Sequence, residues 1–398
     1  MQPVAILIHR LGPYHRSRLN AAAQRFPTVA VEVSSIDNTY AWEKVTAPEL
    51  QRITVFEDVD AYTVPRRILA QRVGFTLQAL QPCAVAIPGW SDPAALAALR
   101  WCAGMGTPVV MMSESQTADG ARQAWKEAVK ARLLRLCGSA LVGGGPHAAY
   151  LQSLGMSVDR IFQGYDVVDN EHFARGADRA REGSETERRR LGLPDRFFLA
   201  SSRFVEKKNL MRLVASFARF RRLSPAMAWK LVMLGDGPLL EDIKLSAKEH
   251  GIGDDLLLPG FQQYDALPAY YGLASAFIHA STVEQWGLVV NEAMAAGLPV
   301  LVSDRCGCAA DLVRNRVNGF TFDPFDIESI TRRMLEIASP TCDRVAMGAQ
   351  SRRIIAEWSP ARFAAALAQA VNCSNGRTAS LFDTALIRFL IHRNNECH

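Results

Sequence analysis

Long apolar runs and signal-like features are missing from this sequence. No stretch reaches the roughly 18 consecutive apolar residues of a membrane-spanning helix, which excludes a chain that crosses a bilayer by helices. The N-terminal residues have neither the basic region nor the small-residue cleavage site of a secretory signal, so 4–8 are expected to form a first strand. Together these absences predict a cytoplasmic protein.

Paired cysteines are missing too, because the eight cysteines show no C-x-x-C spacing of the zinc type. In a reducing compartment they are expected to be free thiols in or near the cores. One close pair, Cys306-Gly307-Cys308, is interpreted as a glycine turn rather than a metal site. No histidine or carboxylate cluster elsewhere has the spacing of metal ligands, so no metal is predicted.

Motifs of two large enzyme classes are also absent. No serine lies in a G-x-S-x-G elbow, and the glycines near Gly12 do not form G-x-G-x-x-G, so hydrolases and dehydrogenases lose support. A net charge of +5 over 398 residues is far from the footprint of a nucleic-acid-binding protein. It favours anionic partners such as phosphates or lipid surfaces only weakly.

The sequence does contain enough apolar material for sizeable cores. Hydrophobic residues make up 49% of the chain. Short apolar runs alternate with helical patterns, which predicts two α/β domains in tandem with mainly parallel sheets. Strands of the first domain are expected at 4–8, 29–33, 53–56, 84–87, 108–112 and 140–142. Strands of the second are expected at 197–201, 230–234, 256–259, 276–279, 300–303 and 319–322.

A charged segment with few large apolar residues, 176–196, is predicted to link the two domains. The N-terminal domain then covers 1–175 and the C-terminal domain covers 197–371. Residues 372–398 form a tail in which 381–391 have apolar residues at helical spacing. This spacing suits packing on either domain or contact with a membrane surface.

One unit of strand, loop, helix and strand, 276–304, carries two glutamates eight positions apart. Glu284 precedes the turn at Gly287, and Glu292 lies in the second turn of the helix that follows. Because the helix is apolar on nearly every other face, an unpaired carboxylate at Glu292 would be costly. Its hydrogen-bond donor is either a ligand hydroxyl or an internal neighbour, and the sequence leaves both open.

Further candidates follow other strands, because ligands of open α/β sheets bind beyond the carboxyl ends of the strands. Arg203 and Lys208 flank a junction of strand and helix that suits a diphosphate, but taken alone each is more often an ordinary solvated charge. Gly235 opens a tight turn after the next strand, where a structural role is favoured.

The first domain offers two comparable positions. Gly12 allows close backbone approach and stands among several arginines, which suits a phosphate or acidic acceptor as well as a basic helix face. Glu114 follows the strand at 108–112. It is a candidate for hydrogen bonds to sugar hydroxyls or for proton transfer, and equally for capping the next helix.

Taken together, these residues resemble the retaining glycosyltransferases of family 4, which have the GT-B fold. The matching segments are 202–209 (SRFVEKKN), 235–239 (GDGPL), 258–261 (LPGF), the E-x7-E pair of Glu284 and Glu292, and 296–300 (AGLPV). Residues 164–170 (GYDVVDN) also look like bacterial members that build surface polysaccharides. We therefore expect an α/β chain with two Rossmann-like doubly wound domains facing across a cleft and a C-terminal helix packed back on the N-terminal domain.

By this resemblance, the C-terminal domain binds a nucleotide sugar and the N-terminal domain binds the acceptor. Arg203 and Lys208 would stabilise the departing diphosphate, and Glu284 would contact the sugar ring. Glu292 would hold the ribose hydroxyls. The resemblance assigns the donor contacts to Gly12, Gly235, Phe261, Gly287, Leu288, Val289 and Glu292. No cofactor or metal is then needed, since two cations and a helix N-terminus stabilise the charge of the leaving group.

The first domain departs from the family. Many members place a histidine on the loop after the strand that corresponds to 108–112, whereas this chain has Ser113-Glu114-Ser115. Glu114 is therefore the candidate for catalysis on the acceptor side. The predicted function is retaining transfer of a sugar from a nucleotide-diphosphate sugar to a hydroxyl of a saccharide, lipid-linked or small-molecule acceptor.

Three alternatives stay open: a sugar-nucleotide epimerase, a phosphorylase on the same fold, and a catalytically silent sugar-nucleotide-binding subunit. A basic amphipathic segment, 125–136, is a candidate for peripheral contact with the inner face of the membrane. Such segments are more often surface helices of a domain.

Overall fold

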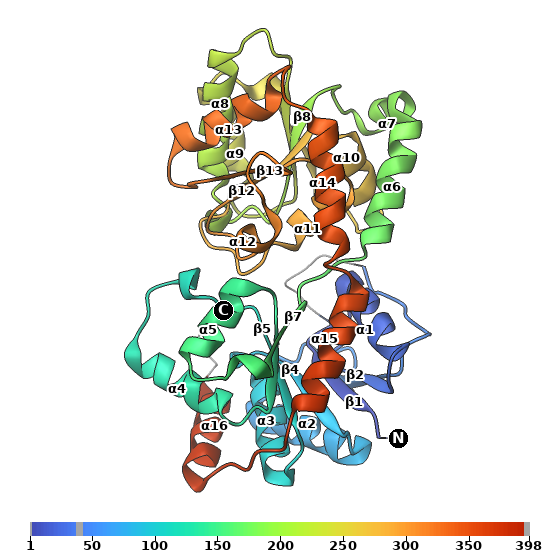
Figure 1. The fold of residues 1–398 in the computed structure, drawn as a ribbon, viewed down its shortest axis with the longest axis vertical. Coiled ribbons are helices and arrows are strands. Elements are labelled where there is room, and N and C mark those ends of the chain that lie inside the picture. The colour runs from blue at the N-terminus through green and yellow to red at the C-terminus, as the bar shows by residue number, and fades with distance from the viewer. Residues whose placement is uncertain (1, 37–42, 394–398) are drawn as a thin grey trace. The chain divides into compact units, whose positions relative to one another are not determined.

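The structure, a computed structural model, describes residues 2–36 and 43–393, so Cys397 lies outside its range. The chain divides into two compact units, and most of their elements are labelled in Figure 1. Unit 1 contains the residues up to Val167 and those from Pro360 onward, and unit 2 contains Val168–Ser359. Each unit is a parallel sheet with helices packed on it, which confirms the predicted pair of Rossmann-like domains.

Unit 1 has a seven-stranded sheet with the order β3-β2-β1-β4-β5-β6-β7, and all of its strand pairs are parallel. Strands β1, β5 and β6 are buried along their whole length, which is why their sequences are continuous apolar runs. The strands are β1 (Val4–Ile8), β2 (Thr28–Ser34), β3 (Arg52–Phe56), β4 (Ala84–Pro88), β5 (Val109–Ser113), β6 (Ser139–Val142) and β7 (Ile161–Gln163).

The helices of unit 1 come from both ends of the chain. They are α1 (Pro13–Ala23), α2 (Arg66–Leu80), α3 (Pro93–Met105), α4 (Ala124–Leu134), α5 (Gly145–Ser153), α15 (Pro360–Cys373) and α16 (Leu381–Arg393). Helix α16 packs against α3 and α2 and buries Ile387 and Ile391 in the core of the unit. The C-terminal helix therefore packs on the N-terminal domain, as predicted.

Unit 2 has a six-stranded parallel sheet with the order β10-β9-β8-β11-β12-β13. Its strands are β8 (Phe197–Ser201), β9 (Lys230–Leu234), β10 (Leu256–Gly260), β11 (Ala276–His279), β12 (Val300–Ser303) and β13 (Gly319–Phe322). Its helices are α6 (Asn170–Glu182), α7 (Ser184–Leu191), α8 (Leu210–Leu223), α9 (Leu240–Glu249), α10 (Leu267–Leu273), α11 (Leu288–Ala295), α12 (Ala309–Leu312), α13 (Ile327–Ala338) and α14 (Arg344–Ala356).

The division into units differs from the predicted boundaries at 175, 197 and 371. The segment predicted as a linker, 176–196, contains most of α6 and all of α7, and both helices belong to unit 2. Helix α6 buries Phe173, Ala177 and Ala180 on one face. Gly176 lets that face approach α10 closely, since a Cβ there would lie 2.4 Å from Cβ of Pro268. Because this apolar face consists mainly of small residues, the scarcity of large apolar residues in the sequence gives no sign of it.

Helix α15, predicted as the end of the C-terminal domain, instead belongs to unit 1. It packs against α1, β6 and β7. The backbone carbonyl of Ala370 accepts a hydrogen bond of 2.7 Å from Ser139 Oγ at the start of β6. An apolar face alone does not tell which sheet a helix covers, so sequence periodicity could not place this helix.

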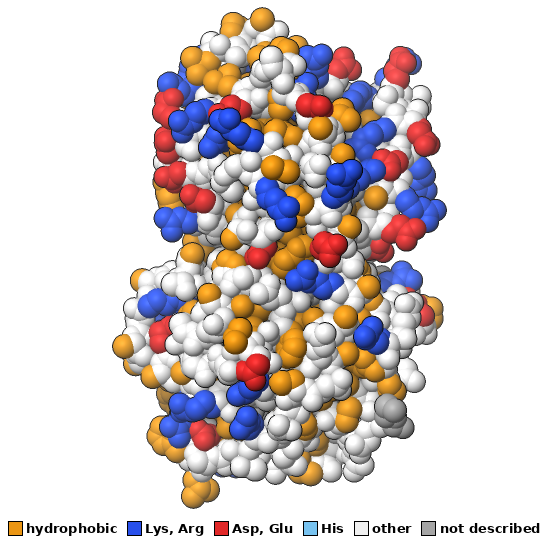
Figure 2. Space-filling model, in the orientation of Figure 1, with side chains coloured by type: hydrophobic (Ala, Val, Ile, Leu, Met, Phe, Trp, Pro, Cys, Tyr) orange, Lys and Arg blue, Asp and Glu red, His pale blue; other side chains and the backbone are white. Residues whose placement is uncertain are grey.

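The surface carries charge of both signs. On the face shown in Figure 2, basic and acidic side chains are intermixed over both units. This mixture agrees with the modest net charge of +5.

Candidate active site

The best-formed polar site of unit 2 lies where its strand order reverses. Strands β8 and β11 are neighbours, yet the strands that follow them in the chain run outward in opposite directions. A crevice forms beyond the carboxyl ends of two such strands, and ligands of open α/β sheets bind there. Lys208 belongs to the loop after β8, and Glu284 belongs to the loop after β11.

Asn209 joins these two loops. It has a left-handed backbone conformation (φ 58°), which asparagine tolerates better than most residues, and its side chain is buried. Its amide nitrogen donates to the carbonyls of Ala280 (3.1 Å) and Pro324 (2.7 Å). The residue directly after Lys208 thus fixes the Lys208 loop to the end of β11.

Three donors converge on one carboxylate oxygen of Glu284. Lys208 Nζ forms an ion pair with Oε2. His279 Nε2 lies 2.9 Å from the same oxygen, and Ser281 Oγ donates to it over 3.0 Å. Burial alone would raise the pKa of Glu284, but the interactions with His279 and Lys208 outweigh burial and hold this pKa well below its usual range. Glu284 is therefore an anion throughout the physiological pH range.

The Glu284 cluster packs against the N-terminus of α11. Gly287 is the residue just before this helix and has φ 103°, a conformation that favours glycine. A Cβ at this position would lie 3.4 Å from Glu284 Cγ and 3.8 Å from His279 Cδ2. The backbone N–H groups of Leu288 and Val289, the first two helical residues, thus lie close to the cluster. A helix N-terminus and a lysine together favour an anion.

Glu292 has an internal partner. Its side chain is fully buried, and its Oε2 accepts a hydrogen bond of 2.6 Å from the hydroxyl of Tyr271 on α10. Tyr271 is itself completely buried. Of the two alternatives that the sequence left open, an internal donor is therefore present. The Tyr271 hydroxyl orients the carboxylate of Glu292. A contact between Glu292 and a ligand remains a proposal.

Arg203, Gly235 and Phe261 lie on neighbouring loops at the same edge of the sheet. Arg203 is exposed in the loop after β8. Gly235 has φ 134°, and a Cβ there would lie 1.8 Å from the carbonyl oxygen of Ser202, so glycine is required for the two loops to touch. The Gly235 N–H donates to Gly260 O over 3.0 Å, which brings Phe261 alongside. The structural role favoured from sequence accounts for Gly235.

Two features of this site were missed by sequence reasoning. His279 is the last residue of β11 and Ser281 follows the strand; both hold Glu284, and reading the hydrogen-bonding side chains at every strand end would have found them. The Cys306-Gly307-Cys308 segment supports the site through its backbone, because Gly307 N donates to Glu284 O over 3.0 Å. Seven cysteines in the described ranges are free thiols.

In unit 1, Gly12 lies at the corresponding reversal of strand order, after β1. Its φ is −117°, so its backbone does not require glycine. Its N–H donates to His15 Nδ1 over 3.2 Å. Burial and the neighbouring Arg18 lower the pKa of His15 to about 3, so this ring is a neutral acceptor.

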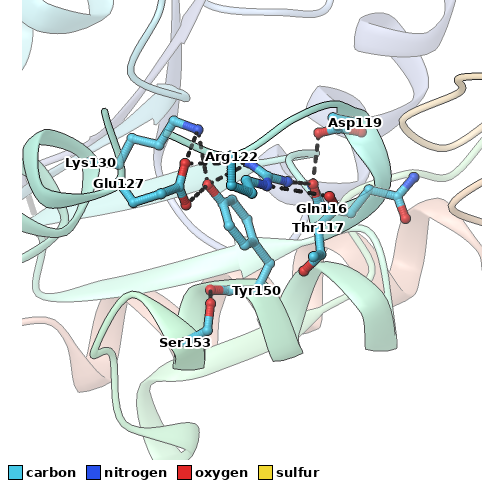
Figure 3. A network of polar contacts seen from close by, with 8 residues as sticks. All are labelled: Gln116, Thr117, Asp119, Arg122, Glu127, Lys130, Tyr150 and Ser153. Atoms are coloured by element: carbon cyan, nitrogen blue, oxygen red, sulfur yellow. Dashed lines mark hydrogen bonds and ion pairs between the residues drawn. The ribbon is translucent and has the colours of Figure 1, made fainter. Parts of the chain in front are cut away.

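Glu114 stands on the loop after β5 and is half-buried. The loop that follows it is held by a polar network, shown in Figure 3. Arg122 donates to the carbonyl of Gln116, and both Arg122 Nη1 and Lys130 Nζ lie 2.9 Å from the hydroxyl of Tyr150. Tyr150 donates in turn to Glu127 of α4 over 2.7 Å. The backbone two residues beyond Glu114 is thereby fixed to α4 and α5.

Between 2–36 and 43–393, no group of three or more His, Cys, Asp or Glu side chains is arranged to hold a metal ion. Over the same ranges, no helix has both the length and the apolarity that crossing a membrane requires.

Comparison with known proteins gives a family for part of the chain. Residues 183–354, which lie in unit 2, match the family described as Glycosyl transferases group 1. A GDP-mannose-dependent alpha-(1-6)-phosphatidylinositol monomannoside mannosyltransferase of Mycobacterium tuberculosis is 32% identical over 175 residues, 42% of this chain and 45% of that protein. An alpha-monoglucosyldiacylglycerol synthase of Streptococcus pneumoniae is 35% identical over 116 residues, 29% of this chain and 26% of that protein. The chain thus matches less than half the length of these relatives.

Solved structures match over nearly the whole chain. The Anabaena protein HepE in complex with UDP and glucose aligns with a TM-score of 0.72 at 14% identity, covering 94% of this chain and 100% of that one. Sucrose-phosphate synthase from Thermosynechococcus elongatus aligns with a TM-score of 0.71 at 17% identity, covering 93% and 98%. At such identities the likeness shows the fold, which is the GT-B fold of glycosyltransferases.

Proposed function

We propose that this chain transfers a sugar from a nucleoside diphosphate sugar to a hydroxyl group, a proposal supported by the match of residues 183–354 to the Glycosyl transferases group 1 family. The acceptor is a saccharide, a lipid-linked sugar or another small molecule. A phosphatidylinositol monomannoside mannosyltransferase and a monoglucosyldiacylglycerol synthase are among the relatives, which supports a lipid-linked acceptor. Transfer proceeds with retention of configuration and without a metal ion.

The observation that carries this proposal is the convergence of Lys208, Glu284 and the N-terminus of α11. A departing nucleoside diphosphate gains negative charge at the moment of bond cleavage. Lys208 and the N–H groups of Leu288 and Val289 would stabilise that charge, and Arg203 on the adjoining loop would add a second cation. The stabilising groups are held in place before the reaction, so little reorganisation is needed as the charge develops.

The remaining donor-side residues bind the rest of the substrate. Glu284 accepts hydrogen bonds from the sugar hydroxyls, and its low pKa keeps it ionised for that purpose. Glu292, oriented by Tyr271, binds the ribose hydroxyls. Gly235 and Phe261 line the adjoining loops, and Gly287 admits the diphosphate to the helix start. Gly12 of unit 1 has no side chain, so the donor or the acceptor can approach its backbone closely.

The transfer step is balanced without a nucleophile from the protein. The acceptor oxygen forms a bond to the anomeric carbon as the bond from that carbon to the diphosphate oxygen breaks. The electron pair of the broken bond leaves with the diphosphate, and the acceptor proton moves to a leaving phosphate oxygen. The new bond forms on the face from which the diphosphate departs, which gives retention.

The direct test compares nucleoside diphosphate release by the native protein and two variants, Lys208→Ala and Glu284→Ala, with UDP-glucose and GDP-mannose as donors and a panel of methyl and octyl glycosides as acceptors. Lys207→Ala is the matched control, because this exposed lysine stands next to Lys208 in the same loop. We expect both site variants to lose turnover and the control to keep it. A robust native activity that survives both substitutions would overturn the site.

The same assay separates the alternative functions. Turnover that depends on inorganic phosphate identifies a phosphorylase, and a donor epimerised in the absence of acceptor identifies an epimerase. Donor binding by calorimetry without turnover across the panel identifies a silent binding subunit.

Peripheral contact with a membrane is a further part of the proposal. Helix α4 exposes Trp125 (54%) next to Lys126, and α16 exposes Leu381, Phe382 and Phe389. Apolar and cationic side chains together suit the surface of an anionic bilayer. Sedimentation with vesicles of phosphatidylcholine and phosphatidylglycerol tests this contact, and absence of salt-sensitive binding would refute it.

A further inference from the structure

A pair of buried tryptophans in unit 2 includes one residue of the Glu284 loop and takes no part in the transfer step described above. Trp286, two positions after Glu284, is 2% exposed, and Trp358, two positions after α14, is 6% exposed. Their ring centres lie 5.1 Å apart, with an angle of 39° between the ring planes. Aromatic pairs at such distances stabilise each other beyond the area that they bury. The position of the Glu284 loop is therefore coupled to that of Trp358.

Trp286 is also bound to α11 and to the loop after β12. Its indole N–H donates to Asn291 Oδ1 over 2.9 Å, and its carbonyl accepts from the N–H of Cys308 over 3.2 Å. Asn291 is fully buried and directly precedes Glu292 in α11. A displacement of the Trp286 ring would thus disturb the contact between the Glu284 loop and the helix whose N-terminus faces the site.

The Glu284 loop depends on such packing for its conformation. Between β11 and α11 the loop contains neither helix nor strand, and its pairing with the neighbouring loop is the isolated bridge between Glu284 and Cys306. Loops with so little regular backbone pairing open locally unless side chains hold them. Trp286 is the largest side chain of this loop, so its contact with Trp358 is well placed to keep the loop closed.

Trp358 is fixed in turn by Asn170, the first residue of α6. The amide nitrogen of Asn170 donates to the carbonyl of Ile355 over 2.9 Å and to the carbonyl of Trp358 over 3.1 Å. Only a donor can lie between two carbonyl oxygens, so these partners determine the orientation of the amide. The N–H of Trp358 donates to the same Ile355 carbonyl over 2.8 Å. The backbone around Trp358 is thereby attached to α6.

Asn170 and Trp358 stand next to the two points where the chain passes from one unit to the other. These crossings follow Val167 and Ser359, and every residue of the path from Glu284 to Asn170 belongs to unit 2. Helix α11 packs against both α6 and α14, the helices next to the crossings (Figure 1). A continuous set of contacts therefore joins the Glu284 loop to the backbone beside both crossings.

We propose that Trp358 is a positioning residue of the donor site, which holds Trp286 and with it the Glu284 loop in the conformation that binds a nucleoside diphosphate. Through Asn170, the same contacts transmit occupancy of the donor site to the backbone beside the two crossings. The inference rests on the proposed function only for the identity of the ligand. Trp358 acts through Trp286 and not by contact with the substrate.

Amide hydrogen exchange of the full chain without ligand tests the positioning role. Trp358→Leu removes the aromatic contact and should speed exchange in peptides that cover 282–290 by about 2- to 10-fold, the range that one aromatic pair supplies. Trp358→Phe keeps a ring and should recover most of the protection. Unchanged exchange in the Leu variant would overturn the proposal. This measurement needs no substrate, so its result stands whether or not the transferase activity is found.

Trp229→Leu is the matched control. Trp229 is 1% exposed in the same unit and packs on Phe198 of β8, with 4.6 Å between the ring centres. Its loss should lower the melting temperature at least as much as Trp358→Leu does, because both substitutions leave a cavity in a packed core. Exchange at 282–290 should nevertheless stay near native. Equal increases in the two variants would show that a general loss of stability opens the loop, which contradicts a positioning role.

A second variant leaves both tryptophans in place. Asn170→Asp replaces the donating amide nitrogen with an oxygen, which repels the carbonyls of Ile355 and Trp358. Exchange at 282–290 should rise in this variant as it does in Trp358→Leu. Native exchange at 282–290 in Asn170→Asp would show that the crossings are not linked to the donor loop, which contradicts the second part of the proposal.

Nucleoside diphosphates then test the link from the site to the crossings. UDP, GDP and ADP are added separately, and a nucleotide that binds the native protein should slow exchange at both 284–290 and 355–359. In Trp358→Leu it should slow exchange at 284–290 alone and bind about 2- to 10-fold more weakly by calorimetry. Native protection confined to 284–290 would overturn the link. If none of the three binds, the proposed function fails and the link to occupancy falls with it, while the exchange measured without ligand still decides the role of Trp358.

Discussion

The two units use the same sheet topology and hold their key carboxyl groups in opposite electrostatic states. In unit 2, Glu284 receives Lys208, His279 and Ser281 on one oxygen, and its pKa is depressed. In unit 1, burial and the nearby charge of Glu114 raise the pKa of Asp166, and Arg18 opposes them. The fold therefore supplies only the place beyond the strand ends. The side chains that surround each carboxyl decide whether it is a permanent anion or a neutral acid.

The largest expected effect comes from removing the cation of unit 2. Lys208→Ala should lower turnover by about 10²- to 10³-fold, the usual loss for one preorganised group that stabilises charge in the transition state. Lys207→Ala, the neighbouring exposed lysine, should stay near native. Steady-state release of nucleoside diphosphate measures both. Equal losses in the two variants would mean that general positive charge matters and not the contact with Glu284.

Glycines at the two strand-order reversals should respond differently to alanine. Gly287 has φ 103°, so Gly287→Ala should destabilise unit 2 by about 1–3 kcal/mol through backbone strain. Gly12 has φ −117° and only an ordinary contact 3.6 Å away, so Gly12→Ala should change stability little. Thermal unfolding of both variants checks the contrast. A lower melting temperature for the Gly12 variant than for the Gly287 variant would reverse it.

His279 should prove to be a positioning residue for Glu284. His279→Phe removes the donor 2.9 Å from Oε2 and should reduce kcat/KM by about tenfold, in line with one hydrogen bond. His279→Gln keeps an N–H donor and should recover most of that loss. If the Gln variant is as impaired as the Phe variant, the ring has a role beyond this hydrogen bond.

The pH dependence of stability should have opposite signs in the two units. Because the pKa of Glu284 is depressed below its ordinary value of 4.5, the contribution of this residue to stability is present above that value and is lost as pH falls through the folded pKa. Because the pKa of Asp166 is raised, its contribution is present in acid and is lost as pH rises through the folded pKa.

Melting temperatures from about pH 8 down to about pH 2 measure this contrast, because the contribution of Glu284 changes only below its ordinary pKa. Relative to native protein, Glu284→Gln should lose most at neutral pH and converge with it in acid. Asp166→Asn should gain on native protein as pH rises. Parallel pH profiles for the two variants would show that the two carboxyl groups do not differ in their electrostatic state.

The sequence predicted the parallel sheets well and the unit boundaries poorly. Strands such as Val4–Ile8 and Phe197–Ser201 are buried on both faces and bounded by turns, so their apolar runs were unambiguous. Helix α6 buries small residues against α10, and α15 covers a sheet formed by residues more than 200 positions earlier. Composition carries no information about such partners.

The candidate site, like the fold, was predictable only in part from the sequence. Lys208 and Glu284 follow neighbouring strands, so the rule that ligands bind beyond strand ends brought them together in advance. The convergence of His279 and Ser281 on one oxygen depends on side-chain orientation, and Asp166, whose pKa is raised by burial and by the charge of Glu114, lies about 50 positions after Glu114. Long-range pairs of this kind are set by packing and not by local pattern.

The return of the chain to unit 1 fixes the order in which the two cores are completed during synthesis. Unit 2 is one continuous segment and has all of its residues once Ser359 has emerged from the ribosome. Unit 1 begins first but lacks Ile387, Ile391 and the Ala370 carbonyl that Ser139 binds until the last helices appear. The seven-stranded sheet of unit 1 therefore keeps an uncovered apolar face while unit 2 folds. A truncation within α16 would destabilise the N-terminal domain.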